Sequence, residues 1–469
     1  MSMKPLVKRI NYKDPLFFCD LLSNCPYLTF LDSSLSGNNY GRYTFIGFDP
    51  EEVYKLKGKN LFLNKKKINK DIFEVLQSVI NTFSLKTIPN LPPFQGGIAG
   101  YISYDFCKET EGIANHKIDD LNFSDLVMCV YDLVIAFDHQ KNQSYIFSTG
   151  YPYKDNKKRL KKARERITFV IKMLEKKSFH YHEAKAETLL WKNNWSKVQY
   201  KKAILKIKKY IFAGDIFQAN LSQRFESKID SKVNLFQLYK RVRSNLPTPF
   251  SAFLSYGNET VCSFSPERFI KVQNKDVETC PIKGTIKRGN SKNQDKKMIY
   301  KLINSKKDHA ENLMIVDVLR NDLSRVCKYF SVNVSSLAEL QSFSNVHHLV
   351  SRINGKLRRN SNVFDLFKAV LPGASITGAP KIRAMEIIAE LEPYKRGPYC
   401  GCIGYIGFNG NVDTNIVIRT FYTNGKKIVL HAGGGIVSDS DPTQEYEESL
   451  VKVETIMKSL GQFSGIKTK

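Results

Sequence analysis

The chain has 469 residues, of which 42% are hydrophobic and 12% are aromatic, a composition that excludes a largely disordered protein. Its formal net charge of +27 invites a nucleic-acid or membrane interpretation. However, the 72 basic residues comprise 54 lysines and 18 arginines, and specific phosphate and base recognition favours the arginine fork, so we expect no nucleic-acid partner.

Residues 1–150 alternate short β-rich runs with turns, as in the run from Tyr43 to Phe48. The longest apolar run, Leu126 to Phe137, is interrupted by Asp132 and is too short to span a bilayer. The chain begins without the apolar core of a signal sequence, and its nine cysteines are odd in number and scattered. These features predict a cytoplasmic protein with reduced thiols and no membrane partner.

Residues 151–195 are charged, and they predict a helical connector. The basic run 157–164 is followed by apolar residues at helical spacing, which favours the solvated face of one surface helix over a binding patch. From residue 196 to residue 460, glycine-containing turns separate strands and long amphipathic helices. Because the order shows no strict βαβ rhythm, we expect an α/β (α+β) fold with largely antiparallel sheets.

An acid and an amine follow in the next part of the chain. Glu267 stands in the run Ser-Pro-Glu-Arg-Phe, and Lys283 stands in the run Pro-Ile-Lys-Gly-Thr. Such a pair can serve as proton donor and nucleophile if the fold brings the two side chains together. On pattern alone, a lysine beside a glycine is more often a solvated turn residue.

A helix is predicted from about Asp308 to Leu323. Two of its carboxylates, Glu311 and Asp322, fall on the same face as the apolar residues Ile315 and Val318. A carboxylate on an apolar face needs a partner, which could be a metal ion or another cation. An ordinary salt bridge is the simpler interpretation.

Two glycine-rich turns are predicted nearer the C-terminus. The run 375–380 leads into a helix at Lys381, whose N-terminus would favour a carboxylate, and the run 431–436 could expose backbone N–H groups to an anion. Arg419 could add a bidentate clamp. Together they indicate an anionic small molecule, although most glycine-rich turns are only turns.

The last helix is predicted to begin after Asp441, with Pro442 at its first position. Glu445, Glu448 and Lys452 then share one face. Paired carboxylates suit Mg²⁺, which prefers oxygen ligands. The alternative is a simple bond from Glu448 to Lys452.

Taken in order, these motifs resemble those of the chorismate-utilising enzymes: the large subunits of anthranilate synthase and aminodeoxychorismate synthase, and their isochorismate and salicylate relatives. The resemblance covers residues 90–457 and rests on the runs 93–97, 213–221, 265–269, 281–285, 310–313, 347–351, 375–380, 433–435 and 445–448. It implies one α/β unit with two large, mostly antiparallel sheets around the active site and helices outside. Within that unit it implies an N-terminal region (1–150), the connector (151–195) and a chorismate-binding region (196–460).

The resemblance also implies roles for individual residues. Glu311 and Glu448, with Glu445 beside them, are expected to hold Mg²⁺, and Glu267 is expected to protonate the departing C4 hydroxyl of chorismate. The groups expected to hold the substrate are Gly284, Thr285, His348, Thr377, Tyr405, Arg419, Gly434, Gly435 and Lys452.

Two positions divide the enzymes that the chain resembles. In the run 281–285, the third position usually has alanine in anthranilate synthases and lysine in aminodeoxychorismate synthases. Lys283 is therefore the expected nucleophile. The expected product is 4-amino-4-deoxychorismate, a precursor of 4-aminobenzoate and folate. Gln218 stands where water-adding relatives carry a lysine, which argues against isochorismate and salicylate synthesis. Anthranilate synthase is the close alternative, and a basic nucleic-acid-binding protein on an inactive enzyme fold is the out-of-class one.

Ammonia needs a source. Cys400 and Cys402 lack the nucleophile elbow of a glutaminase, so we expect a separate glutamine amidotransferase subunit that supplies ammonia. The resemblance further implies a tryptophan pocket that involves Ser33, Tyr40, Pro249 and Phe250.

Overall fold

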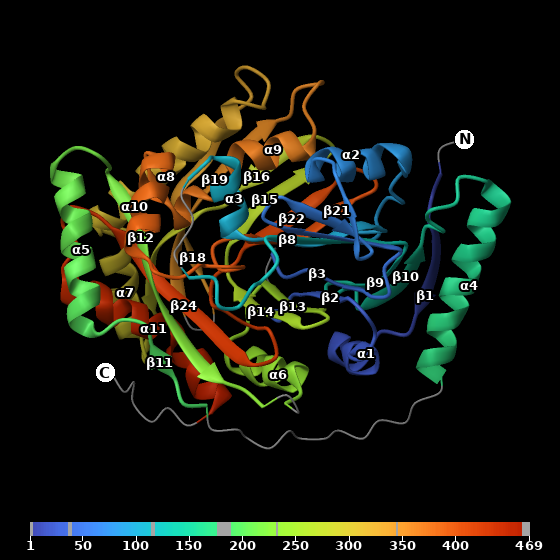
Figure 1. The fold of residues 1–469 in the computed structure, drawn as a ribbon, viewed down its shortest axis with the longest axis horizontal. Coiled ribbons are helices and arrows are strands. Elements are labelled where there is room, and N and C mark those ends of the chain that lie inside the picture. The colour runs from blue at the N-terminus through green and yellow to red at the C-terminus, as the bar shows by residue number, and fades with distance from the viewer. Residues whose placement is uncertain are drawn as a thin grey trace.

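The computed structural model describes residues 3–35, 40–113, 118–175, 189–230, 233–343 and 346–461. Two large β-sheets, each of 12 strands within these residues, form the centre of the molecule, and helices surround them (Figure 1). Neighbouring strands in both sheets pair antiparallel, as β12 does with β24 and β7 with β21. This arrangement confirms the predicted fold class.

The first sheet joins strands from both ends of the chain. In order of hydrogen-bonded neighbours, with β20 (Gly378–Ala379) pairing beside β12, it contains β1 (Leu6–Ile10), β10 (Gln143–Ser148), β9 (Leu133–Asp138), β3 (Tyr43–Gly47), β2 (Leu28–Asp32), β13 (Phe250–Tyr256), β14 (Glu259–Ser265), β23 (Thr420–Thr423), β24 (Lys427–Ile436), β12 (Gln218–Lys228) and β11 (Lys192–Asn193).

The second sheet also joins strands from distant parts of the chain. In order, with β18 (Asn333–Ser342) pairing beside β19, it contains β17 (Ile282–Lys287), β19 (Val346–Lys356), β16 (Asp276–Thr279), β15 (Arg268–Gln273), β22 (Val412–Ile416), β21 (Cys402–Gly407), β7 (Gly97–Ile102), β8 (Leu126–Tyr131), β4 (Glu52–Lys57), β5 (Asn60–Leu63) and β6 (Lys66–Ile68).

Helices cover the outside of the sheets (Figure 1). Within the described residues, none of them has the length and apolar character that crossing a membrane requires. They are α1 (Pro15–Leu22), α2 (Ile72–Thr82), α3 (Tyr104–Thr110), α4 (Asn156–Glu175), α5 (Lys197–Phe212), α6 (Leu235–Asn245), α7 (Lys292–Ile303), α8 (Lys306–Ser324), α9 (Val363–Val370), α10 (Lys381–Leu391) and α11 (Pro442–Leu460), with a short 3₁₀ turn at Ala374–Ile376.

Strands from residues 1–150 and from residues 196–460 are neighbours in both sheets. In the first sheet β2 pairs with β13, and in the second β7 pairs with β21. One hydrophobic core accordingly extends from Phe45 to Val429. The N-terminal and chorismate-binding regions expected from the sequence are therefore interleaved in a single α/β unit.

Both helices that carry the predicted site have side-chain caps, of which only Asp441 was predicted. Ser305 accepts a hydrogen bond from the Asp308 N–H at the start of α8, and Asp441 accepts from two N–H groups at the start of α11. The basic run 157–164 lies on α4, which buries Ile167 and Val170 against the body of the protein. The predicted helix is therefore confirmed, although Arg159 of the run is buried and donates to the carbonyls of Lys4 and Thr149.

Two local predictions were wrong. The Gly433–Gly435 run is not a turn but part of β24, where a Cβ on Gly433 would collide with the Leu221 carbonyl of β12. Lys283 likewise lies in a strand, β17, whose register shifts between Ile282 and Thr285, and Gly284 adopts a φ of 90° there. Such an irregularity redirects a side chain, so the strand can aim Lys283 away from the regular sheet face.

Arg396 lies between α10 and β21 and ties this segment to β12 of the first sheet and to the 3₁₀ turn. It is fully buried, it pairs with Glu392 at 2.7 Å, and its guanidinium also donates to the carbonyls of Asn220 and Ile376. A buried guanidinium is tolerated only because these acceptors replace its water shell.

Arg396→Ala should lower the free energy of unfolding by about 3–5 kcal/mol, because it leaves the Glu392 carboxylate buried without its cation. Urea denaturation followed by circular dichroism measures this loss. Arg320→Ala is the control, because Arg320 is 52% exposed and forms a long surface ion pair of 3.4 Å with Asp317. It should change the free energy of unfolding by less than about 0.5 kcal/mol. An equally small effect for both variants would contradict the structural role of Arg396.

Candidate active site

A cavity of about 530 Å³ opens among α8, α11, β17 and β24. Residues from both sheets and from separate helices line it, so the fold assembles it from distant parts of the chain. The predicted site residues that line it are Glu267, Lys283, Gly284, Thr285, Glu311, His348, Arg419, Gly434, Gly435, Glu445, Glu448 and Lys452.

Lys283 reaches into this cavity from the irregular part of β17. Its Nζ lies 3.7 Å from Glu311 Oε2, and each of the two side chains is only 12% exposed. The Asn312 amide donates to the Lys283 carbonyl at 3.2 Å, and the Ser351 hydroxyl in turn donates to Asn312. The lysine is therefore held by its backbone, while its amine projects into the cavity.

Glu267 faces the same cavity and is only 5% exposed. Burial raises its pKa to about 7, although the hydrogen bond from Ser375, the charge of Lys283 and the Ile282 N–H all oppose that rise. The Ser375 hydroxyl donates to Glu267 Oε1 at 2.7 Å. A carboxyl group with this pKa can carry a proton near neutral pH, as a general acid must.

Three carboxylates face lysines at the ends of α8 and α11. Lys307 Nζ lies 3.0 Å from Glu445 Oε1 and 3.9 Å from Glu311 Oε1. Burial alone would lower the pKa of Lys307, but Glu445 and Glu311 raise it overall. Glu448 pairs with Lys452 at 2.8 Å, so the simple i, i+4 bond considered from sequence is present.

These carboxylates suit Mg²⁺ in their chemistry. The donor set consists of oxygens, and the Lys307 ammonium lies between Glu311 and Glu445, where two anions call for a cation. Among the described residues, no three His, Cys, Asp or Glu side chains are grouped closely enough to hold a metal ion alone. Mg²⁺ commonly uses one or two protein carboxylates and completes its shell with water and substrate oxygens, so the residues fit that ion.

Arg419 and His348 line another part of the cavity, where an anion could bind. Burial lowers the pKa of Arg419, and no acidic residue in the described part of the chain pairs with its guanidinium. Arg419 also has a φ of 50°, a strained conformation that is typical of functional sites. His348 bonds Thr285 through Nδ1 at 2.7 Å, and burial, aided by Arg419, lowers the pKa of His348 to about 3. Arg419 is thus a cation available to a substrate carboxylate.

Two residues predicted to hold the substrate lie elsewhere. Tyr405 stacks on Phe94 at 4.5 Å and lines a second cavity, because β21 turns it to the other side of the sheet. Thr377 is fully buried; its hydroxyl donates to the Gly373 carbonyl, and its own carbonyl accepts from the Asn220 N–H. Tyr399, which was not predicted, lines the active-site cavity.

Several site residues were not predicted. Asn312 and Ser375 position Lys283 and Glu267, and Lys307 pairs with the carboxylates. Asn312 directly follows Glu311 on α8, so a buried polar residue beside a site carboxylate was a signal in the sequence. The pairing of Ser375 with Glu267 joins residues 108 positions apart and left no such signal.

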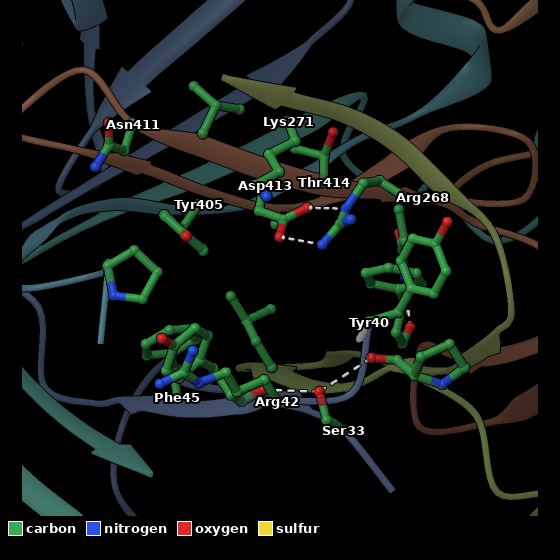
Figure 2. Close-up of a pocket in the computed structure, with 18 of the residues that line it drawn as sticks. Ser33, Tyr40, Arg42, Phe45, Arg268, Lys271, Tyr405, Asn411, Asp413 and Thr414 are labelled. Atoms are coloured by element: carbon green, nitrogen blue, oxygen red, sulfur yellow. Dashed lines mark hydrogen bonds and ion pairs between the residues drawn. The ribbon is translucent and has the colours of Figure 1, made fainter. Parts of the chain in front are cut away.

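The second cavity, of about 470 Å³, is lined by strands of both sheets (Figure 2), and Lys283 is not among its lining residues. Ser33, Tyr40, Pro249 and Phe250 line it, as the resemblance implied. Arg268 is bidentate to Asp413 at 3.0 and 3.1 Å, and its guanidinium lies over the rings of Tyr40 and Phe250. The cavity therefore combines aromatic walls with polar groups that are already paired.

The main cavity defines a class: an enzyme site for a small anionic molecule, with an acid, an amine and a cluster of carboxylates. The sequence profile of the family described as chorismate binding enzyme matches residues 31–458. The chain belongs to this family of chorismate-binding enzymes.

Individual relatives agree with this assignment. The chain is 36% identical to aminodeoxychorismate synthase component 1 of Escherichia coli (strain K12) over 95% of each chain. It is 35% identical to anthranilate synthase component 1 of Acetivibrio thermocellus, over 95% of this chain and 92% of that one. The crystal structure of anthranilate synthase component I from Streptococcus pneumoniae TIGR4 superposes with a TM-score of 0.80 at 29% identity, covering 90% of this chain and 93% of that one.

If Glu267 donates a proton, chorismate turnover should fall as pH rises through about 7, because the acid form is then lost. Ser375→Ala removes a hydrogen bond that favours the charged carboxylate, so it should move this descending limb of the kcat profile to higher pH. Glu267→Gln should abolish the limb and lower kcat by roughly 10²–10⁴-fold. An unmoved limb in Ser375→Ala would assign the limb to another group.

Proposed function

We propose that this chain converts chorismate and ammonia into 4-amino-4-deoxychorismate and water. One observation carries the proposal: Lys283 projects its amine into the cavity between Glu311 and the Glu267 acid. The resemblance stated from sequence associates a lysine at this position with amination at C4 and an alanine with anthranilate formation. Belonging to the family supports chorismate as the substrate.

In the proposed first step the Lys283 amine forms a bond to C2 of the ring, the double bonds shift, and the C4–O bond breaks. Glu267 delivers its proton to the departing oxygen, which leaves as water. Hydroxide leaves poorly, so this proton lowers the barrier where the charge develops. Ammonia then bonds to C4, the double bonds shift back, and the C2–N bond to Lys283 breaks, which restores the lysine. The proton that the new ammonium group loses returns to Glu267. Arg419 would hold the carboxylate of the enolpyruvyl side chain, and the ring carboxylate would lie at the end of the cavity where Glu311, Glu445 and Glu448 would hold Mg²⁺.

Mg²⁺ fits the same proposal. Glu311, Glu445 and Glu448 are the residues that would hold it, and when bound it would neutralise charge between these carboxylates and a substrate carboxylate. Glu311→Gln should raise the Mg²⁺ concentration that gives half-maximal kcat/KM by about tenfold or more, because it removes one anionic ligand. Magnesium titrations of kcat/KM for wild type and Glu311→Gln measure this. An identical midpoint in both would remove Glu311 from the ligand set.

Anthranilate synthase is the second candidate, because a relative of that name is as similar to the chain as the aminodeoxychorismate synthase is. It would aminate C2 and release pyruvate. Purified chain with chorismate, Mg²⁺ and ammonium should form a product that yields 4-aminobenzoate only after an aminodeoxychorismate lyase is added. Fluorescent anthranilate appearing without the lyase would sink the first candidate and favour the second.

Lys283→Ala should lower turnover with saturating ammonium by at least about 100-fold, equivalent to ~2.7 kcal/mol in the barrier, because the covalent step is lost. Mass spectrometry of wild type quenched during turnover should show a chorismate-derived adduct on Lys283 that the variant lacks. Lys287→Ala, a neighbour on β17 that also lines the cavity, controls for loss of positive charge. A wild-type rate in Lys283→Ala would refute the nucleophile.

The partners follow from the same proposal. Both relatives are named component 1, which supports a separate subunit, and we assign that subunit the hydrolysis of glutamine to ammonia. Nine free cysteines suit the reducing cytoplasm.

We also propose that the second cavity holds tryptophan between its aromatic walls. Isothermal titration with tryptophan should give one site, which Phe250→Ala would weaken.

A further inference from the structure

The outer face of α5 carries an unusual exposed stripe. Val198, Leu205 and Phe212 are 62%, 51% and 73% exposed, and they recur every seven residues. This spacing places all three on one line along the helix. Isolated exposed apolar residues are ordinary, but aligned ones of this size indicate a contact surface.

Lysines separate these apolar residues. Lys202 and Lys209 lie on the same line and are exposed, and no residue in the described part of the chain forms an ion pair with either. Other lysines of α5 are paired, as Lys206 is with Glu390 and Lys197 with Glu447. The helix contains no acidic residue. We call the line Val198, Lys202, Leu205, Lys209 and Phe212 the α5 ridge.

The α5 ridge lies one short turn away from the active-site strand. Phe217, 70% exposed, follows α5, and the next residue, Gln218, begins β12 and is fully buried. Neither the nitrogen nor the oxygen of the Gln218 side-chain amide has a hydrogen-bond partner among the described residues. The amide packs against Gly435, and Lys283 Nζ lies 3.3 Å from the point that a Cβ on this glycine would occupy. Asn220, two residues on, lines the cavity with its Nδ2 unpaired in the same part of the structure.

An exposed apolar surface and unpaired polar groups beside the nucleophile are thus joined by consecutive residues. The unpaired amides of Gln218 and Asn220 are costly to bury unless a polar molecule reaches them. Ammonia is such a molecule, since it both donates and accepts hydrogen bonds. A surface at the outer end of this segment is therefore suited to the protein that delivers ammonia.

We propose that the α5 ridge, with Phe217 at its end, is the docking surface for the glutamine-hydrolysing subunit, and that this subunit presents an apolar groove with an acidic rim. The inference rests on the proposed function, because it requires ammonia as the co-substrate. The alternation of apolar and cationic side chains fits a protein groove, in which the apolar residues supply affinity and the lysines supply orientation.

The test uses the full-length chain with the purified glutamine-hydrolysing subunit of the same organism. Leu205→Glu/Phe212→Glu should weaken binding of that subunit at least tenfold in sedimentation velocity, and should lower the glutamine-dependent rate at limiting subunit at least tenfold. The rate with saturating ammonium should stay within twofold of wild type, because neither residue touches the cavity.

Phe169→Glu is the matched control. Phe169 is 47% exposed on the basic helix α4, which lies at the opposite end of the molecule's long axis from α5 (Figure 1). This variant should keep both rates and the subunit affinity. Lys202→Glu/Lys209→Glu, which leaves the apolar residues in place, should weaken binding at least tenfold at low salt.

The outcomes separate the two proposals. If wild type forms no 4-amino-4-deoxychorismate from chorismate and ammonium, the proposed function fails. If wild type is active and Leu205→Glu/Phe212→Glu retains wild-type affinity and glutamine-dependent rate, the docking surface is wrong. A loss of the ammonium-dependent rate in that variant would also overturn the proposal, because it would place α5 in the site itself.

Discussion

The site depends on burying charges of opposite sign in one cavity. A carboxylate or an ammonium alone would be expensive to remove from water, but Lys283 shares the cavity with Glu311 and Glu267 and lowers the cost of burying each carboxylate. The balance differs between the two acids. Burial raises the pKa of both acids, but two lysines oppose the rise at Glu311, whereas Glu267 is more completely buried and its pKa reaches about 7. One cavity thereby holds an acid suited to charge binding and an acid suited to proton donation.

The scaffold brings these charges together from strands that allow close approach. Gly433 lets β24 lie against β12, and Gly434 leaves room for Glu445 and Lys452 of α11. On the opposite wall, the irregular register of β17 directs Lys283 inward. A larger side chain at Gly434 would push α11 away from the sheet and move its carboxylates away from Lys283. The glycines therefore act through the space that they leave empty.

Local signals in the sequence predicted the helices of the site but not the geometry between elements. The cap at Asp441 and the apolar spacing on α8 depend on neighbouring residues, so these elements could be located in advance, although the cap at Ser305 was not predicted. The glycine run was misassigned as a turn, because its need for glycine comes from the partner strand β12 rather than from its own dihedral angles. Tyr405 was misplaced because the face of a strand that points to a given cavity is set by register, which long-range pairing determines.

The alternation of side chains along an extended segment also connects the two cavities. Glu267 lines the active-site cavity, and the next residue, Arg268, begins β15 and lines the second cavity, where it is bidentate to Asp413. Successive residues of an extended segment point to opposite sides. The backbone that sets the position of the acid is thus anchored from the other cavity by a charged, hydrogen-bonded pair.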